Sequence, residues 1–141
     1  MVALAKHLGV EDRLILTSGR SDVPRLMMGS DLLVHAARSE LAGLVLIEAM
    51  TAGLPVLVTD VCGYAEHVAA AGAGLVLPSP FDQRQMDQAL ARMLTSPQER
   101  AQWGEAGRRY TADIAARRSP TLEAELLEEI AREKRKGRGR D

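Results

Sequence analysis

The organisation of this chain follows from one run of residues, Glu40-Leu41-Ala42-Gly43-Leu44-Val45-Leu46-Ile47-Glu48-Ala49-Met50-Thr51-Ala52-Gly53. Its second part is apolar on every side except at Glu48 and Thr51, which predicts a helix enclosed by protein. A carboxylate inside such a helix is costly unless a partner satisfies it. Glu48 is therefore a candidate ligand-binding residue.

The position of this helix in the chain predicts what it binds. The strand-like run Asp31–Ala36 precedes it, so its N-terminus should open at the carboxyl edge of a parallel sheet, where open α/β sheets bind ligands. Gly43 allows close approach to the backbone, and the free N–H groups and dipole of the first turn favour a phosphate. At 1.5 Å per residue, Glu48 lies roughly 7.5 Å into the helix. The order Glu48, helix N-terminus, Glu40 thus corresponds to ribose, diphosphate and sugar, whose hydroxyls are good donors to carboxylates.

The rest of the chain alternates strand-like and helix-like runs. Strands are predicted at 14–17, 31–36, 55–59 and 75–77, and helices at 2–8, 22–29, 44–53, 64–71, 82–94, from 97 onward and at 122–130. This alternation indicates an α/β protein with a parallel sheet of about four strands and right-handed crossovers. Asp22 is expected to cap the helix that it begins.

The composition fits a single soluble globular domain. The 141 residues are 46% hydrophobic and 26% charged. The lone Cys62 excludes an internal disulfide. Residues 1–9 lack the pattern of a signal peptide, and Glu48 and Pro55 interrupt the most apolar stretch, which predicts no membrane span.

The charges are unevenly distributed, because residues 132–141 hold six basic and two acidic side chains. The remainder has 12 of the 18 basic and 17 of the 19 acidic residues, which argues against nucleic acid as a partner. The basic tail is a candidate for contact with anionic lipid, at about 1 kcal/mol per basic residue, although a merely solvated tail is the preferred interpretation. The three histidines, His7, His35 and His67, have no ligand-like spacing, so no metal site is expected.

Glu40 and Glu48, followed by Ala-Met-Thr-Ala-Gly-Leu-Pro-Val at 49–56, resemble the donor-site signature of retaining glycosyltransferases of family 4, which have the GT-B fold. The runs at 18–23, 31–35 and 62–65 are similar to members that add glucose to lipopolysaccharide core heptose. The resemblance implies a Rossmann-like domain at 1–119, the C-terminal half of a GT-B fold, followed by a C-terminal helix and basic tail at 120–141. It also implies UDP-glucose as donor, no metal or other cofactor, and a cytoplasmic location, with possible peripheral contact at the inner face of the inner membrane.

The same resemblance assigns roles to single residues. Glu40 is the expected catalytic residue, and the expected donor-binding residues are Glu48, Leu41, Ala42, Gly43, Leu44, Arg20, Gly19 and Gly63. Family members also use an Arg and a Lys upstream of the region matching Met1, and a glycolipid acceptor held by an N-terminal domain. We therefore expect this chain by itself to lack transfer activity.

Other interpretations stay open at this point. The chain could be a non-catalytic nucleotide-binding or interaction remnant. A glycosidase pair of Glu40 and Glu48 is disfavoured, because such carboxylates face each other about 5 to 9.5 Å apart across a cleft. Arg20 is equally well explained as an exposed loop residue, and His35 is better explained as a hydrogen-bonded core histidine. Cys62 is expected to be inert packing.

Overall fold

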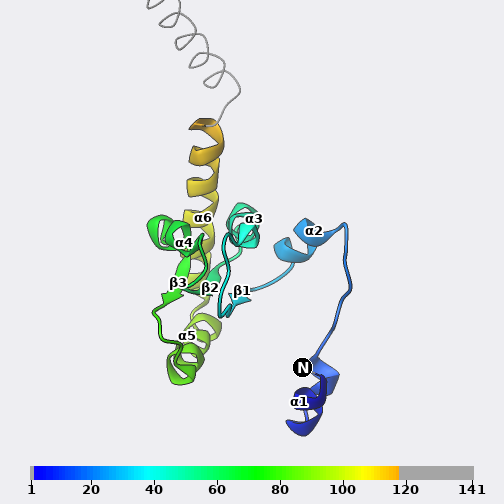
Figure 1. Ribbon diagram of the computed structural model, residues 1–141. Helices are drawn as coiled ribbons and strands as arrows, with labels where there is room; N and C mark the ends of the chain where they lie inside the picture. The colour runs from blue at the N-terminus through cyan, green and yellow to red at the C-terminus, as the bar shows by residue number, and fades with distance from the viewer. Residues whose placement is uncertain (1, 118–141) are drawn as a thin grey trace, which may run out of the picture.

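The computed structural model describes residues 2–117, in which helices cover both faces of a small parallel sheet (Figure 1). The elements are α1 (Val2–His7), the 3-10 helix η1 (Glu11–Arg13), α2 (Val23–Met28), β1 (Leu33–His35), α3 (Leu44–Ala52), β2 (Val56–Thr59), α4 (Ala65–Ala71), β3 (Gly74–Leu77), α5 (Gln83–Thr95) and α6 (Pro97–Arg117). The α/β class and the alternation predicted from residue 31 onward are confirmed.

The sheet has the order β1-β2-β3 with every pair parallel. Val34 lies opposite Leu57, which in turn lies opposite Leu75. The helix α3 connects β1 to β2, and α4 connects β2 to β3. Every residue of the central strand β2 is buried, as its continuous apolar sequence predicts for a strand covered on both faces.

Alternate residues of β2 point into two separate layers of the core. Val56 and Val58 belong to a cluster that includes residues of α3 and α4, with Tyr110 of α6 packed against it. Leu57 belongs to a second cluster with residues of α5. The sheet is therefore covered by α3, α4 and α6 on one face and by α5 on the other (Figure 1).

The long helix α6 packs on α3 through glycines. A Cβ added at Gly104 would lie 2.3 Å from the carbonyl oxygen of Gly53, and one added at Gly107 would lie 3.2 Å from the Cβ of Met50. Because neither glycine has a side chain, the backbone of α6 reaches the end of α3. This contact fixes the C-terminal end of the helix whose other end is the candidate site.

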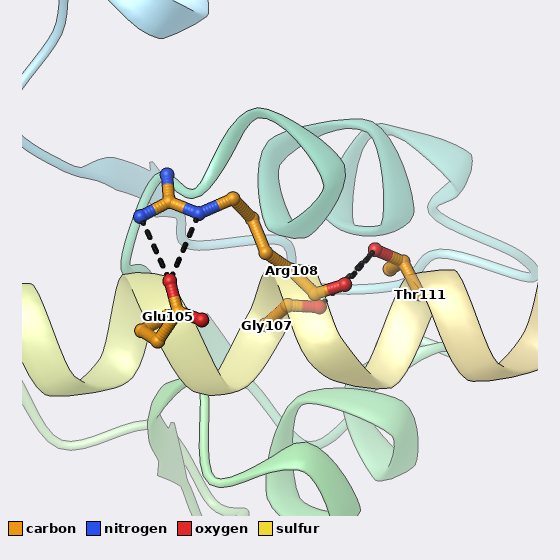
Figure 2. A network of polar contacts seen from close by, with 4 residues as sticks. All are labelled: Glu105, Gly107, Arg108 and Thr111. Carbon is orange, nitrogen blue, oxygen red and sulfur yellow. Dashed lines mark hydrogen bonds and ion pairs between the residues drawn. The ribbon is translucent and has the colours of Figure 1, made fainter.

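Arg108 of α6 closes the same junction (Figure 2). Its guanidinium is held by Glu105 at 3.3 Å, and it fills the space that a Cβ at Gly53 would need. Gly53 has a φ of 75°, which favours glycine at the end of a helix. The hydroxyl of Thr111 donates to the carbonyl oxygens of Gly107 and Arg108.

The prediction of a strand at 14–17 is wrong, so the sheet has three strands rather than about four. Ile15 is 85% exposed and Leu16 58% exposed, and the segment pairs with no other strand in the described part of the chain. In a sheet of spatial order 3-2-1-4-5-6, strand 3 precedes strand 4 in the sequence but lies beside strand 2. If β1, β2 and β3 correspond to strands 4, 5 and 6 of this order, the segment at 14–17 corresponds to strand 3. It then cannot pair with β1.

The N-terminal elements lie away from the sheet. The helix α1 packs on η1, and an extended segment leads from them to α2, which packs against α3 (Figure 1). None of the helices within residues 2–117 is both long and apolar enough to cross a bilayer. The predicted helix at 122–130 and the basic tail at 132–141 fall outside the described residues.

Candidate functional site

The N-terminus of α3 is built around Gly43, its N-cap residue. Gly43 has a φ of 83°, in the left-handed region where other residues are strained. A Cβ at this position would also lie 2.3 Å from the Sγ atom of Cys62. No side chain caps the helix, and its first turn carries no acidic residue. The N–H of Leu46 donates to the carbonyl oxygen of Gly43, and the other first-turn N–H groups, together with the helix dipole, are available to an anion.

The backbone around this helix end is accessible. Leu41 is 98% exposed and Leu44 is 59% exposed, while Gly43 between them is buried. Ala42 is exposed as well. A ligand at the end of α3 can thus reach the backbone of residues 41–44, as predicted for a donor-binding loop.

Two loops at the carboxyl edge of the sheet are joined by backbone hydrogen bonds. The N–H of Gly63 donates to the carbonyl oxygen of Glu40 at 3.1 Å, and the N–H of Tyr64 donates to that of Ala42 at 2.8 Å. Glu40 and Cys62 form an isolated parallel bridge. One loop follows β1 and the other follows β2, and they pair in parallel as the strands do, with the register shifted by one residue relative to β1 and β2. The pairing holds the main chain at Glu40 in place.

This pairing gives Gly63 and Cys62 structural roles. A Cβ at Gly63 would lie 2.1 Å from the carbonyl oxygen of Leu41, so only glycine allows the two loops to approach. The N–H of Gly63 already donates to the carbonyl oxygen of Glu40 and does not support a contact with the nucleotide sugar. The role of Gly63 in binding the nucleotide sugar therefore stays a prediction. The buried thiol of Cys62 lies 3.5 Å from the carbonyl oxygen of Ala42, in keeping with its predicted packing role.

Glu40 lies next to His35, the last residue of β1. The distance from His35 Nε2 to Glu40 Oε2 is 4.0 Å, and the side chains are 24% and 40% exposed. Within residues 2–117, Nε2 is buried and has no hydrogen-bond partner. The interpretation of His35 as a hydrogen-bonded core histidine is therefore not met at Nε2, and the residue is only half-buried. Spacing in the sequence alone could not reveal the pair, because it depends on the path of the loop at 36–39.

Glu48 is exposed, so the prediction of a helix enclosed on all sides is also wrong. Leu44, Glu48 and Thr51 form an exposed stripe on α3 that no described element covers. On one side, Glu48 lines a cavity of about 390 Å³ between α2 and α3, whose other walls include Val23 and Met27. The carboxylate thus borders a largely apolar hollow and remains accessible to ligand hydroxyls.

A second cavity, of about 260 Å³, lies between α3, α4 and α6. Its lining includes Ile47 and His67, and the Nδ1 atom of His67 lies 2.8 Å from the hydroxyl of Tyr110. This contact joins α4 to α6. The two cavities flank α3, while its N-terminus faces solvent between them.

Gly19 and Arg20 lie in the segment before α2, and within residues 2–117 no side-chain hydrogen bond or ion pair joins either of them to residues 40–44. Both Arg20 Nε and Nη2 donate to the carboxylate of Asp22 at 2.7 Å. This pairing raises the pKa of Arg20 and lowers the pKa of Asp22. Asp22 is the N-cap residue of α2, as predicted, but its carboxylate binds Arg20 and makes no cap hydrogen bond.

Three of the predicted elements of the site therefore converge at one edge of the sheet. Glu40, the backbone of residues 41–44 and the loop at Gly63 come together, and Glu48 lies further along the same helix. Among residues 2–117, no three His, Cys, Asp or Glu side chains gather in a way that could hold a metal ion.

The comparison with protein families decides what this arrangement is part of. The family model of the glycosyl transferases group 1 matches residues 1–110. The chain belongs to this family. All the residues of the candidate site fall within the matched region, including both carboxylates and the loop at Gly63.

Similar proteins include one from Escherichia coli and one from Bacillus anthracis. The chain is 50% identical over 108 residues to the lipopolysaccharide glucosyltransferase WaaG of Escherichia coli (strain K12), covering 77% of this chain and 29% of that protein. It is 37% identical over 68 residues to an N-acetyl-alpha-D-glucosaminyl L-malate synthase of Bacillus anthracis, covering 48% of this chain and 18% of the relative.

Solved structures share the fold. The crystal structure of WaaG superposes with a TM-score of 0.76 at 49% identity, over 78% of this chain and 30% of that one. A sucrose-phosphate synthase from Thermosynechococcus elongatus matches in fold, with a TM-score of 0.75 at 24% identity over 92% of this chain and 33% of that one. The chain thus spans less than a third of the length of WaaG, and the match confirms that it has the fold of part of a GT-B glycosyltransferase.

Proposed function

We propose that this chain is the donor-binding part of a retaining glycosyltransferase that transfers glucose from UDP-glucose to a heptose of the lipopolysaccharide core, without a metal ion. The proposal is supported by 50% identity to a lipopolysaccharide glucosyltransferase across the segment that holds both carboxylates. The proposal includes a cytoplasmic location, as the resemblance implies.

The observation that carries the proposal is the open N-terminus of α3 between Glu40 and Glu48. A helix end that no side chain caps, beside the exposed residues Leu41 and Leu44, is suited to a diphosphate. The helix dipole contributes about 0.3 to 2 kcal/mol toward such an anion. The leaving group of the reaction, UDP, gains negative charge as the bond from the sugar carbon to the diphosphate breaks. The N–H groups of this helix end therefore stabilise the transition state.

The two carboxylates would bind opposite ends of the donor. Glu48 accepts hydrogen bonds from the ribose hydroxyls, beside the cavity between α2 and α3. Glu40 accepts from hydroxyls of the glucose and stabilises the positive charge that develops on the sugar. The electron pair of the broken bond leaves with UDP, and the acceptor hydroxyl forms the new bond to the sugar carbon and passes its proton to an oxygen of the departing diphosphate.

Calorimetric titration of the chain with UDP-glucose, UDP and a guanosine diphosphate sugar tests the proposal. We expect UDP-glucose to bind and the guanosine compound to bind at least several-fold more weakly. Glu48→Ala should weaken binding of UDP-glucose, whereas Asp87→Ala, on α5 at the other face of the sheet, should not. Equal affinity for both donors, or failure to bind either, would contradict the assigned function.

A further inference from the structure

The imidazole of His35 has an unused polar atom directed at the candidate catalytic residue. Its Nε2 is buried and lacks a hydrogen-bond partner among residues 2–117, and the nearest carboxylate oxygen is Oε2 of Glu40, at 4.0 Å. A buried polar group without a partner costs free energy, and native structures rarely keep one without a reason. The atom therefore calls for an explanation within the site.

The backbone fixes both residues of this pair. His35 is the last residue of β1 and lies opposite Val58 of the buried strand β2. The carbonyl oxygen of Glu40 accepts the N–H of Gly63, and the residue forms a parallel bridge to Cys62. With both main-chain positions held, only the side-chain torsions of Glu40 remain to be set.

We propose that His35 is a positioning residue for Glu40. The imidazole carries a proton on Nε2 and donates to one carboxylate oxygen of Glu40, leaving the other oxygen free for a sugar hydroxyl. A separation of 4.0 Å exceeds a hydrogen bond, and a side-chain rotation of Glu40 or one bridging water closes it. This inference rests on the proposed function, in which Glu40 contacts the sugar of the donor.

In such a site, His35 affects the binding of the sugar but not the binding of the nucleotide. The ribose and diphosphate contacts assigned to Glu48 and the α3 N-terminus do not involve His35. Loss of the Nε2 donor should therefore reduce the gain in affinity that glucose adds to UDP. It should leave the affinity for UDP itself unchanged.

Two variants of the full chain separate the effect of the Nε2–H group from the effect of the ring volume. His35→Phe fills the space of the imidazole without a donor, and His35→Gln restores an N–H group near the position of Nε2. We expect the ratio of UDP-glucose affinity to UDP affinity to fall about 3- to 10-fold in His35→Phe and to be retained in His35→Gln. A ratio unchanged in His35→Phe, or lowered equally in both variants, would overturn the inference.

Nitrogen NMR of the imidazole gives a second measurement that needs no ligand and no His35 variant. We expect His35 in the 141-residue chain to show the Nε2-protonated tautomer, with a resonance that shifts in Glu40→Gln. Protonation at Nδ1 alone, or no response to Glu40→Gln, would overturn the inference. If the wild-type chain binds no UDP-glucose, the proposed function fails, and this measurement still decides whether His35 positions Glu40.

Discussion

Glu40 and Glu48 differ in what surrounds them, although both are carboxylates at the same helix. Glu40 is held by backbone pairing to the loop at Gly63 and has His35 beside it. Glu48 is exposed on α3 and borders an apolar cavity. Glu40, which is fixed and has a polar neighbour, suits a position beside the sugar, where charge develops. Glu48, which is accessible, suits contacts with the ribose that are alike in the ground and transition states.

The first prediction separates these roles by substitution. Glu48→Ala should weaken binding of UDP about 10-fold, toward the low end for a charged acceptor because the side chain is exposed. Glu40→Ala should leave UDP binding almost unchanged and mainly slow sugar transfer in the complete enzyme. Calorimetry with UDP and steady-state kinetics measure the two effects. Equal losses of UDP affinity in both variants would contradict the division.

At the scale of elements, the position of α3 depends on its contact with α6. The glycines of α6 allow its backbone to approach the end of α3, and Arg108 covers Gly53 at the junction. The same helix α6 is joined to α5 by an ion pair between Arg92 and Glu99. These contacts set the geometry of the site from a distance, because α3 carries Gly43 at its other end.

The second prediction tests the α3–α6 contact. Gly104→Ala adds a methyl group 2.3 Å from the carbonyl oxygen of Gly53, which is too close. Since this neighbour is backbone, we expect a loss of about 1 to 3 kcal/mol in the free energy of unfolding, measured by urea denaturation. Gly29→Ala is the control, because its Cβ would make ordinary contacts at 3.6 Å and its φ is −94°. A stability equal to that of the control would show that the helices are not in such close contact.

The third prediction concerns the Arg92–Glu99 pair and pH. The Arg92 guanidinium lowers the pKa of Glu99 below its ordinary value of 4.5. A carboxyl with a lowered pKa in the folded state stabilises the protein above its unfolded pKa, and that contribution disappears as the pH falls through the folded pKa. Arg92→Gln should therefore reduce the loss of stability below about pH 4.5, which thermal unfolding at a series of pH values would show.

The matched control for this pair is Arg84→Gln, which removes a positive charge from the same exposed face of α5. Asp60 also has a lowered pKa, caused by hydrogen bonds from Ser79, so part of the acid sensitivity should persist in both variants. The prediction fails if Arg92→Gln and Arg84→Gln have the same stability at every pH.

At the scale of the whole molecule, the chain corresponds to less than a third of WaaG. The described sheet has three strands, and the apolar residues Ile15 and Leu16 are exposed in an unpaired segment. The carboxylates and the helix end that we assign to the donor lie in this part of the fold. Transfer also requires the acceptor to be held beside the donor, and effective molarities of about 10⁵ to 10⁸ M depend on that arrangement.

The fourth prediction is that these 141 residues fold, bind UDP weakly and transfer no glucose. Binding should be weak because the helix dipole contributes only about 0.3 to 2 kcal/mol toward the phosphate. Incubation with UDP-glucose and a heptose-terminated core acceptor, with Glu40→Ala as the control, measures the activity. Glucose transfer above the level of the control would contradict the prediction.

The sequence by itself determined the α/β class, the order of elements from residue 31 onward and the glycine at the start of α3. These features depend on local patterns, since apolar runs, helix periods and chain-reversing glycines act over a few residues. It also pointed to Glu40 and Glu48 through their spacing around one helix. The tertiary structure decided which of the predicted residues meet. It paired Arg20 with Asp22, exposed Glu48 and joined the loops at Glu40 and Gly63.

The tertiary structure also brought His35 next to Glu40, and it left the apolar segment at 14–17 without a strand to pair with. Both outcomes depend on distant parts of the chain. A strand forms only where a neighbour supplies its hydrogen bonds, and a histidine meets a carboxylate only through the path of the loop between them. Local patterns cannot encode either condition, because the partners are set by the packing of the whole sheet.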